Sequence, residues 1–175
     1  MYNEEDLHDH RTVALAARLV HPPYTVKPMA ESKFLFSINL KHRMITFPIG
    51  KCHADESLLE GLAREMQEEL GLDLAGFTEH SSEIKPVVTF TNEYDFTGKN
   101  VKIETNVFFI DYPIGEWICL NAQNMEPDEC GGIFIATVGD VQQMCKVLGL
   151  TMADCVSAFP WYATSTKQKG DFCHA

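Results

Sequence analysis

The sequence predicts a protein of the α/β class that forms one domain. The length of 175 residues suits one domain better than two, and a hydrophobic content of 45% is enough for a sizeable core. Segments of strand-like composition also lie on both sides of one amphipathic helix in the middle of the chain. We therefore expect a single domain over residues 1–175, in which residues 1–10 and 164–175 are loose termini.

Three strands are expected before the central helix. They are rich in aliphatic, aromatic and β-branched residues and comprise Thr12–Val20, Lys33–Leu40 and Met44–Pro48. The alanines of the first segment also permit a helix, but His21-Pro22-Pro23 would end either element. After the third strand we expect a loop that leads from Gly50 into the helix.

The central helix has sequence signals at both ends. Asp55 or Glu56 begins it, with Ser57 as an alternative N-cap, and Gly71 ends it as a C′ glycine. Apolar residues at the helical period predict one buried face; they are Leu59, Leu62, Ala63, Met66 and Leu70.

The neighbouring face of this helix collects acids. Glu65, Glu68 and Glu69 stand at offsets of three and four, so their carboxylates lie on one side of the helix. Oxygen-rich clusters of this kind bind hard divalent cations such as Mg²⁺. Taken alone, the same pattern also fits an acidic helix face that is simply solvated.

Beyond the helix we expect a hairpin. Ile84–Phe90 has strand composition, with Pro86 placing it at an edge or a bulge, and Val101–Tyr112 is the clearest strand of the chain. The segment Thr91–Asn100, which contains Asp95 and Gly98, is interpreted as the turn between them.

The last third is expected to hold one strand and two helices. An irregular segment over Pro113–Glu129 precedes a strand over Ile133–Val138. An amphipathic helix follows over Asp140–Leu148. A shorter helix is expected over Thr151–Phe159, capped by Thr151 and stopped by Pro160.

The spacing of residues around the acidic helix is highly specific. It runs Gly50, five residues, Glu56, seven residues, Arg64-Glu65, an aliphatic residue, any residue, Glu68-Glu69, any residue, Gly71 and an aliphatic residue. This array resembles the Nudix box with every fixed position filled, which chance would produce in roughly one window in 10⁹. Two neighbouring positions differ from the usual family pattern, since Ile49 and Asp55 stand where glycine is common.

The resemblance implies a Nudix-type α/β/α sandwich around a mixed β-sheet and the activity of a Nudix pyrophosphohydrolase. Such a hydrolase cleaves a nucleoside diphosphate linked to another group X. We expect a (deoxy)nucleoside triphosphate or a related nucleotide, giving a monophosphate and pyrophosphate. ADP-ribose, a dinucleoside polyphosphate and capped RNA stay open as substrates. A nucleotide-binding Nudix domain without turnover is a further alternative, which the intact set of acids disfavours.

The resemblance also implies roles for the box residues. Glu65, Glu68 and Glu69 would bind Mg²⁺, or Mn²⁺ as an alternative, with help from the carbonyl of Gly50. One of these acids, or Glu56, would activate water. Arg64 would hold the acids in place, since it can pair with Glu60 or Glu68 at helical spacing. Family members often supply a further acid from a loop before a late strand, and the best match is Glu129, with Glu126 and Asp128 as competitors.

Several residues outside the acid set are candidates for substrate binding. The basic residues Lys51, Lys41 and Arg43 flank the box and could contact phosphates, although lone bases are also common surface charges. Tyr94 and Phe96 could stack on a base, with ordinary packing as the alternative reading.

Composition limits the partners. A formal net charge of −11 makes a nucleic-acid backbone an unfavourable ligand, except at a capped RNA end, and favours a small nucleotide. The chain has no apolar run of about 20 residues, so no membrane segment is expected. Its acidic start does not resemble a signal peptide, and its six cysteines form no C-x-x-C pair. We expect free thiols, a cytoplasmic protein and, since family members are often dimers, a homodimer as one possible state.

Overall fold

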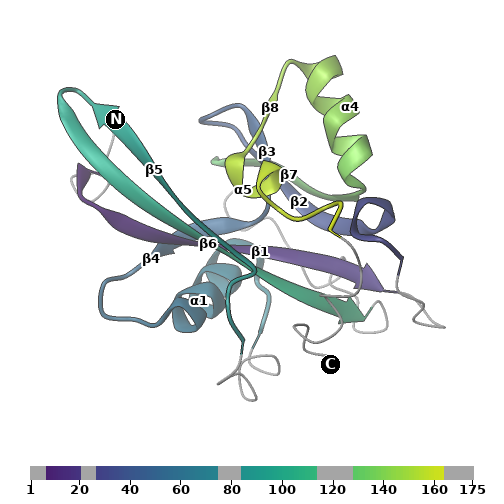
Figure 1. Ribbon diagram of the computed structural model, residues 1–175, viewed down its shortest axis with the longest axis horizontal. Helices are drawn as coiled ribbons and strands as arrows, with labels where there is room; N and C mark the ends of the chain where they lie inside the picture. The colour runs from purple at the N-terminus through teal and green to yellow at the C-terminus, as the bar shows by residue number, and fades with distance from the viewer. Residues whose placement is uncertain (1–6, 21–26, 75–83, 114–127, 164–175) are drawn as a thin grey trace.

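Figure 1 shows a computed structural model that describes residues 7–20, 27–74, 84–113 and 128–163. These residues form an eight-stranded sheet with the order β5-β6-β1-β2-β3-β8, in which β4 also pairs with β1 and β7 with β2. The elements are β1 (His10–Val20), η2 (Met29–Glu31), β2 (Lys33–Asn39), β3 (Met44–Thr46), β4 (Ile49–Cys52), α1 (Leu58–Leu70), β5 (Val88–Phe96), β6 (Lys99–Pro113), β7 (Cys130–Ala136), α4 (Val138–Leu148), β8 (Thr151–Met152) and α5 (Asp154–Ser157).

β1 is the central strand of the sheet. It runs parallel to β6 along its whole length and antiparallel to β2 and β4. Its alternate residues enter two cores: Val13 and Leu15 pack with residues of α1, whereas Ala14 and Ala16 belong to the core that holds α4 and α5. Helices therefore cover both faces of a mixed sheet, and the expected α/β/α sandwich is confirmed (Figure 1).

The core beneath α4 and α5 is largely aromatic. The ring of Phe34 lies with its centroid 5.0 Å from that of Trp161 and 5.5 Å from that of Phe159. The indole Nε1 of Trp161 donates to the carbonyl of Val156 at 2.7 Å, so its polar atom is satisfied inside the core. This packing fixes α5 against the sheet.

The termini of α1 follow local chemistry. Of the three alternative starts, Ser57 is the N-cap: its side chain accepts from the backbone N–H of Glu60, and the Glu60 side chain accepts from the backbone N–H of Ser57. Gly71 ends the helix as expected, in the left-handed conformation with φ 65°.

Residues expected in the box loop form a strand instead. β2 pairs with β1 only at Arg18 and Leu19, which leaves the first half of β1 without a neighbour on that side. β4 occupies this edge, antiparallel to β1 over residues 11–14. The prediction of a loop from Gly50 onward was therefore wrong for residues 50–52. These residues are a strand because they pair with β1, which lies about 40 residues earlier and gives no local signal near Gly50.

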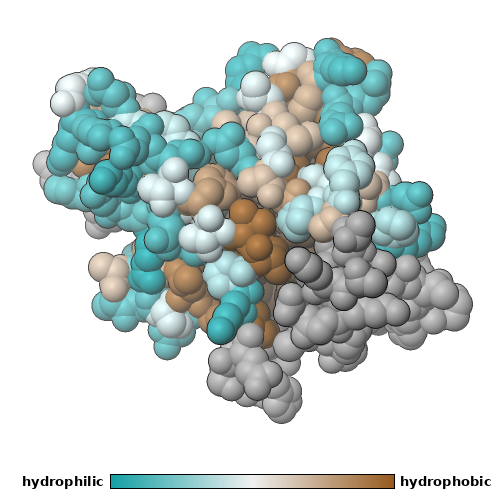
Figure 2. All heavy atoms as spheres, viewed as in Figure 1, coloured by the Kyte–Doolittle hydropathy of each residue, from teal (hydrophilic) through white to brown (hydrophobic). Residues whose placement is uncertain are grey.

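The hairpin is confirmed, but its expected boundaries were wrong. β5 begins at Val88 and continues to Phe96, so the turn shrinks to Thr97 and Gly98, both with positive φ (54° and 86°). Polar residues alternate along β5 because it is an edge strand, as Figure 2 shows by the hydrophilic surface of this projecting hairpin. That polarity made the second half of the strand resemble a turn.

The C-terminal elements also differ from expectation. Thr151 and Met152 pair in parallel with β3 as β8, so Ala153 rather than Thr151 precedes the short α5. α4 begins at Val138, with a capping box between Thr137 and Asp140.

The expected irregular segment over Pro113–Glu129 lies largely outside the described residues, as do residues 1–6 and 164–175 of the expected loose termini. His10, placed in the N-terminal lead-in by the sequence, begins β1. None of the helices that the structure describes combines the length and the apolar character needed to cross a membrane.

Candidate active site

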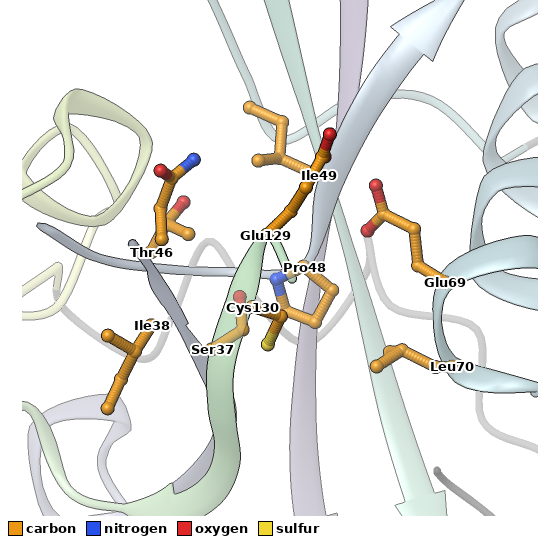
Figure 3. A pocket seen from close by; sticks show the side chains of 10 residues that line it. Ser37, Ile38, Thr46, Pro48, Ile49, Glu69, Leu70, Glu129 and Cys130 are labelled. Carbon is orange, nitrogen blue, oxygen red and sulfur yellow. The ribbon is translucent and has the colours of Figure 1, made fainter. Parts of the chain in front are cut away.

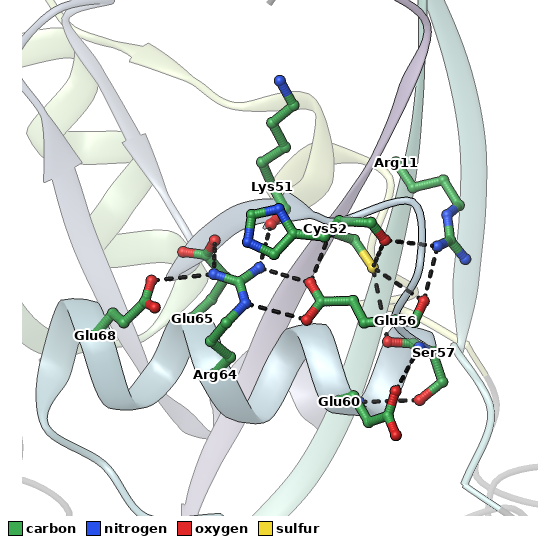
Figure 4. A network of polar contacts seen from close by, with 10 residues as sticks. Arg11, Lys51, Cys52, Glu56, Ser57, Glu60, Arg64, Glu65 and Glu68 are labelled. Carbon is green, nitrogen blue, oxygen red and sulfur yellow. Dashed lines mark hydrogen bonds and ion pairs between the residues drawn. The ribbon is translucent and has the colours of Figure 1, made fainter. Parts of the chain in front are cut away.

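The guanidinium of Arg64 is the centre of a network of acids on α1 and the loop before it (Figure 4). It binds Glu56 through two bonds, from Nε to Oε2 at 3.1 Å and from Nη2 to Oε1 at 2.6 Å. Its Nη1 donates to Glu65 Oε1 at 2.9 Å and to Glu68 Oε2 at 3.0 Å. Of the two pairings that the sequence left open, the structure forms the one with Glu68, because Glu60 is engaged in the capping box.

The same side chain ties the helix to the sheet. Nη2 of Arg64 donates to the backbone carbonyl of Lys51 in β4 at 2.8 Å. A second arginine supports the loop from β1: Nη2 of Arg11 donates to the carbonyls of His53 at 3.1 Å and Glu56 at 2.9 Å. Sequence reasoning missed Arg11, which lies 45 residues before Glu56 and outside the box.

Arg64 affects Glu56, which is partly buried, and Glu65, which is buried, differently. Its hydrogen bonds lower the pKa of Glu56 to about 2, which leaves this group ionised and a weak proton acceptor at neutral pH. Burial raises the pKa of Glu65, whose residue is only 9% exposed, and the hydrogen bond from Arg64 opposes this shift. The two carboxylates therefore have separate proton affinities although one guanidinium binds both.

Glu65 lies directly against Gly50. A Cβ atom built on Gly50 would overlap the Oε2 atom of Glu65, so the strand and the carboxylate can approach only because residue 50 has no side chain. The structure thus brings together the first glycine of the box and its most buried acid, which lie fifteen positions apart in the sequence.

Glu69 faces a different neighbour. Together with Glu129 it lines a cavity of about 70 Å³, in which the Glu69 side chain extends from α1 and the Glu129 side chain from the residue just before β7 (Figure 3). Asp128 is exposed and is not among the residues that line this cavity, and Glu126 lies outside the described residues. Glu129 is therefore the competitor that the fold brings to the acidic helix.

The donor set suits a hard divalent cation in kind. Glu65, Glu68, Glu69 and the backbone of Gly50 offer only oxygen ligands, as Mg²⁺ prefers. Within the described ranges, however, no three His, Cys, Asp or Glu side chains are arranged as a closed metal-binding group. The reason is visible in the contacts: Arg64 binds one oxygen of Glu65 and one of Glu68, while Glu69 faces the cavity shared with Glu129.

A larger cavity of about 580 Å³ adjoins the small one, with which it shares Asn39, Thr46 and Ile49. Tyr94 and Phe96 line it from β5, with ring centroids 5.9 Å apart and an angle of 30° between the ring planes. Both aromatic residues singled out by the sequence therefore border a cavity that reaches the acids.

The basic residues are distributed less simply. Lys41 and Arg43 lie in the exposed turn before β3, and neither lines the larger cavity, whereas His42 between them does. Lys51 lies on β4, and its side chain extends away from the acid network (Figure 4).

The larger cavity also contains a polar pair that was not predicted from the sequence. Nδ2 of Asn92 donates to Oδ2 of Asp154 at 2.8 Å, which links β5 to the first turn of α5. Phe90, Asn92 and Tyr94 stand two positions apart on β5. A predicted strand that continued through Phe96 would therefore have placed all three on one face.

Comparisons with known proteins agree with this geometry. A family model described as NUDIX domain matches residues 33–140, more than half of the chain. A Nudix hydrolase from M. smegmatis, RenU, is similar in structure with a TM-score of 0.50 and 14% identity, covering 88% of this chain and 82% of that one. The NUDIX domain of Shewanella oneidensis NrtR, solved with ADP ribose, has a TM-score of 0.50 and 15% identity, with 87% and 84% covered. A comparison with curated proteins found no match.

Proposed function

Since this chain belongs to the Nudix hydrolase family, as a pyrophosphohydrolase, we propose that it uses Mg²⁺ to hydrolyse a (deoxy)nucleoside triphosphate or related nucleotide. The products would be a nucleoside monophosphate and pyrophosphate. The observation that carries this proposal is the position of the box acids, held by Arg64 and packed against Gly50, beside a cavity with aromatic walls.

The acids would hold the cation. Nudix hydrolases generally use divalent metal ions, and here Glu65, Glu68, Glu69 and the Gly50 carbonyl would bind Mg²⁺, or Mn²⁺ instead, with Glu129 as a further acid from β7. The bound ion would neutralise phosphate oxygens and lower the pKa of a coordinated water. Arg64 would position the carboxylates, because four of its hydrogen bonds hold Glu56, Glu65 and Glu68 before substrate arrives and a fifth ties it to the Lys51 carbonyl.

The general base is better sought within the trio than at Glu56. A group with a pKa of about 2 accepts a proton weakly at neutral pH. Both oxygens of Glu56 are also bonded, to Arg64 and, for Oε1, to the backbone N–H of His53 at 2.7 Å. We propose that Glu56 orients Arg64, and that one of Glu65, Glu68 and Glu69 orients or deprotonates water.

The larger cavity would receive the nucleoside. Its volume of about 580 Å³ lies within the usual range for small-molecule sites, roughly 300–1,000 Å³. Phe90, Tyr94 and Phe96 offer ring surfaces on which a base can stack, and the Asn92–Asp154 pair offers polar atoms at its edge.

ADP-ribose is the second candidate substrate, since the Shewanella NUDIX domain was solved with that ligand. Dinucleoside polyphosphates and capped RNA are further candidates from the resemblance. A panel of these compounds with purified protein and Mg²⁺, read out by chromatography of the products, separates them from nucleoside triphosphates.

The acid assignment has its own test. Glu68→Gln/Glu69→Gln should abolish turnover of the best substrate, while Glu31→Gln, an exposed acid in η2, should leave it unchanged. Full activity in the double variant would sink the assignment. Tight nucleotide binding without hydrolysis, at several divalent metals, would instead favour a binding domain without turnover.

We further propose one cytoplasmic domain that acts on a small nucleotide, with a homodimer as one possible assembly. The described cysteines are all free thiols, as expected in a reducing compartment; they are Cys52, Cys130, Cys145 and Cys155. Light scattering during size-exclusion chromatography would test the oligomeric state.

A further inference from the structure

A separate cavity lies where β1 begins and β4 ends. Its volume is about 370 Å³, and its lining residues are His8, Asp9, His10, Arg11, Lys51, Cys52, His53 and Ala54. Five of these eight residues are basic, in a chain whose formal net charge is −11. The cavity also collects three of the seven histidines of the chain. We call it the basic pocket.

The strand register explains why basic residues meet here. Lys51 of β4 stands opposite Thr12 of β1, so His10, two residues before Thr12, is a diagonal neighbour of Lys51 on the same face of the sheet. His53 follows β4 in the loop, and Arg11 reaches that loop from β1 through the carbonyls of His53 and Glu56. Residues from two distant segments thus converge on one pocket.

The acid in the pocket is engaged elsewhere. The carboxylate of Asp9 accepts the backbone N–H of Lys102 in β6 at 2.8 Å, which holds it toward the neighbouring strand. Nδ1 of His10 is bonded to the carbonyl of His8 at 2.8 Å, which fixes one edge of that ring. The pocket therefore keeps a surplus of positive charge and N–H donors, which suits an anion.

The larger cavity, which we call the aromatic cavity because Phe90, Tyr94 and Phe96 line it, lies on the face of the sheet to which His10 and Lys51 of the basic pocket belong. The hydroxyl of Thr12, opposite Lys51, donates to the hydroxyl of Thr105 at 2.9 Å, and Thr105 lines the aromatic cavity. On β4 itself, Ile49 lines the aromatic cavity and Lys51 lines the basic pocket. These two residues point to the same side and are about 7 Å apart along the strand. Gly50, which lies between them along β4, faces the opposite side of the strand, toward α1, where Glu65 packs against it.

We propose that the basic pocket binds the β- and γ-phosphates of a nucleoside triphosphate, the part that leaves as pyrophosphate, while the nucleoside occupies the aromatic cavity. This inference rests on the proposed function and adds to it the place where the leaving group binds, with a phosphate rather than a sugar as X. In the corresponding reaction the oxygen of water bonds to the α-phosphorus, and the bond from that phosphorus to the bridging oxygen breaks. Pyrophosphate leaves with the bonding electrons, and the proton lost by water goes to the general base. Positive charge in the basic pocket would stabilise the charge that develops on the leaving pyrophosphate.

Inorganic tripolyphosphate is the probe for this pocket, because it has the phosphate chain and no nucleoside. The best variant is His8→Ala/His53→Ala, since both residues are exposed. The hydrogen bonds described above use their backbone carbonyls and not their imidazole rings. Calorimetry should show binding of tripolyphosphate that weakens about tenfold in the variant. Lys33→Gln is the matched control, since Lys33 pairs with Leu19 at the far end of β1 and should change binding less than about twofold.

Kinetics give the second readout. The variant should lose about tenfold in kcat/KM for the nucleoside triphosphate and almost nothing for ADP-ribose, whose group X carries no phosphate chain. If the double variant unfolds at a lower temperature, His8→Glu, which introduces a negative charge at one exposed residue before β1, gives the same comparison.

The outcomes separate the two proposals. Unchanged tripolyphosphate binding in both His8 variants, or a preference for ADP-ribose in the unmodified protein, would overturn the polyphosphate subsite while hydrolysis by a Nudix enzyme still stood. Tripolyphosphate binding that depends on His8, in a protein that hydrolyses no nucleotide, would support the pocket and overturn the proposed function.

Discussion

The carboxylate of Glu65 occupies the space that a side chain at Gly50 would need. Gly50 is not among the glycines with positive φ, so this position requires glycine for close approach rather than for backbone conformation. The contact joins β4 to α1 at the place where the acids and the strand meet. This contact explains why the box begins with a glycine fifteen positions before Glu65.

Gly50→Ala should displace Glu65 and damage the site more than the fold. The new methyl group would overlap the carboxylate, which has to rotate away from β4. We expect a loss of about 1–3 kcal/mol in unfolding free energy and a fall of at least about 100-fold in kcat/KM. Gly139→Ala is the control, because a Cβ there would meet only Thr137 Oγ1 at 3.8 Å. Equal activity in the two variants would contradict this account.

Arg64 gives the protein a dependence on acid pH. The pKa of Glu56 is about 2, below the ordinary value of 4.5, because Arg64 binds the ionised form. Ionised Glu56 therefore stabilises the fold above the ordinary pKa, and this contribution is lost as pH falls from 4.5 through about 2. Arg64→Met should be less stable at pH 7 and should lose less further stability on acidification. Urea unfolding across this range would show parallel curves for the two proteins if the pairing were unimportant.

The sequence identified those parts of the site whose partners are local. The helix ends depend on Ser57, Glu60 and Gly71, and the acid face depends on offsets of three and four, so both could be predicted from one stretch. The sequence could not decide whether Glu60 or Glu68 is the partner of Arg64, because Glu60 can form either the capping box or the ion pair.

Features that depend on contacts between distant segments could not be predicted from local sequence patterns. β4 exists because β2 leaves part of β1 unpaired, and β8 exists because β3 offers it a parallel edge. Arg11 supports the loop before α1 from β1, and Asp154 contacts Asn92 from an element 62 residues away. No local periodicity contains these contacts, since tertiary pairing decides them.

Glu65→Gln should separate stability from function. Burial raises the pKa of Glu65, so the unfolded chain ionises this group at a lower pH than the folded protein does. Ionised Glu65 therefore costs stability at pH 7 in the absence of a cation, and the neutral amide should raise the thermal midpoint by a few degrees, roughly 2–5 °C. The same variant should lose activity and the stabilisation caused by Mg²⁺. Glu68→Gln, at a half-exposed position, should give no such rise.

The Asn92–Asp154 pair should control how the base is bound rather than the chemistry. The carboxylate of Asp154 accepts from Asn92 at 2.8 Å, and Asn92 also donates to the Tyr94 hydroxyl at 3.3 Å, so the three side chains fix one another around the aromatic cavity. Removing the stacking ring by Tyr94→Ala should raise KM about tenfold, because stacking on an aromatic side chain is worth about 1–3 kcal/mol per base. Since the acids of α1 are untouched, kcat should change by less than about threefold.

Asp154→Asn keeps the shape but removes an acceptor charge, so it should alter the order of preference among bases more than the rate with the best one. Tyr94→Phe is the matched control, which keeps the ring and removes only the hydroxyl. Steady-state kinetics with four nucleoside triphosphates would decide the matter: equal falls in kcat across all bases, with KM unchanged, would place these residues in the catalytic step and not in the nucleoside site.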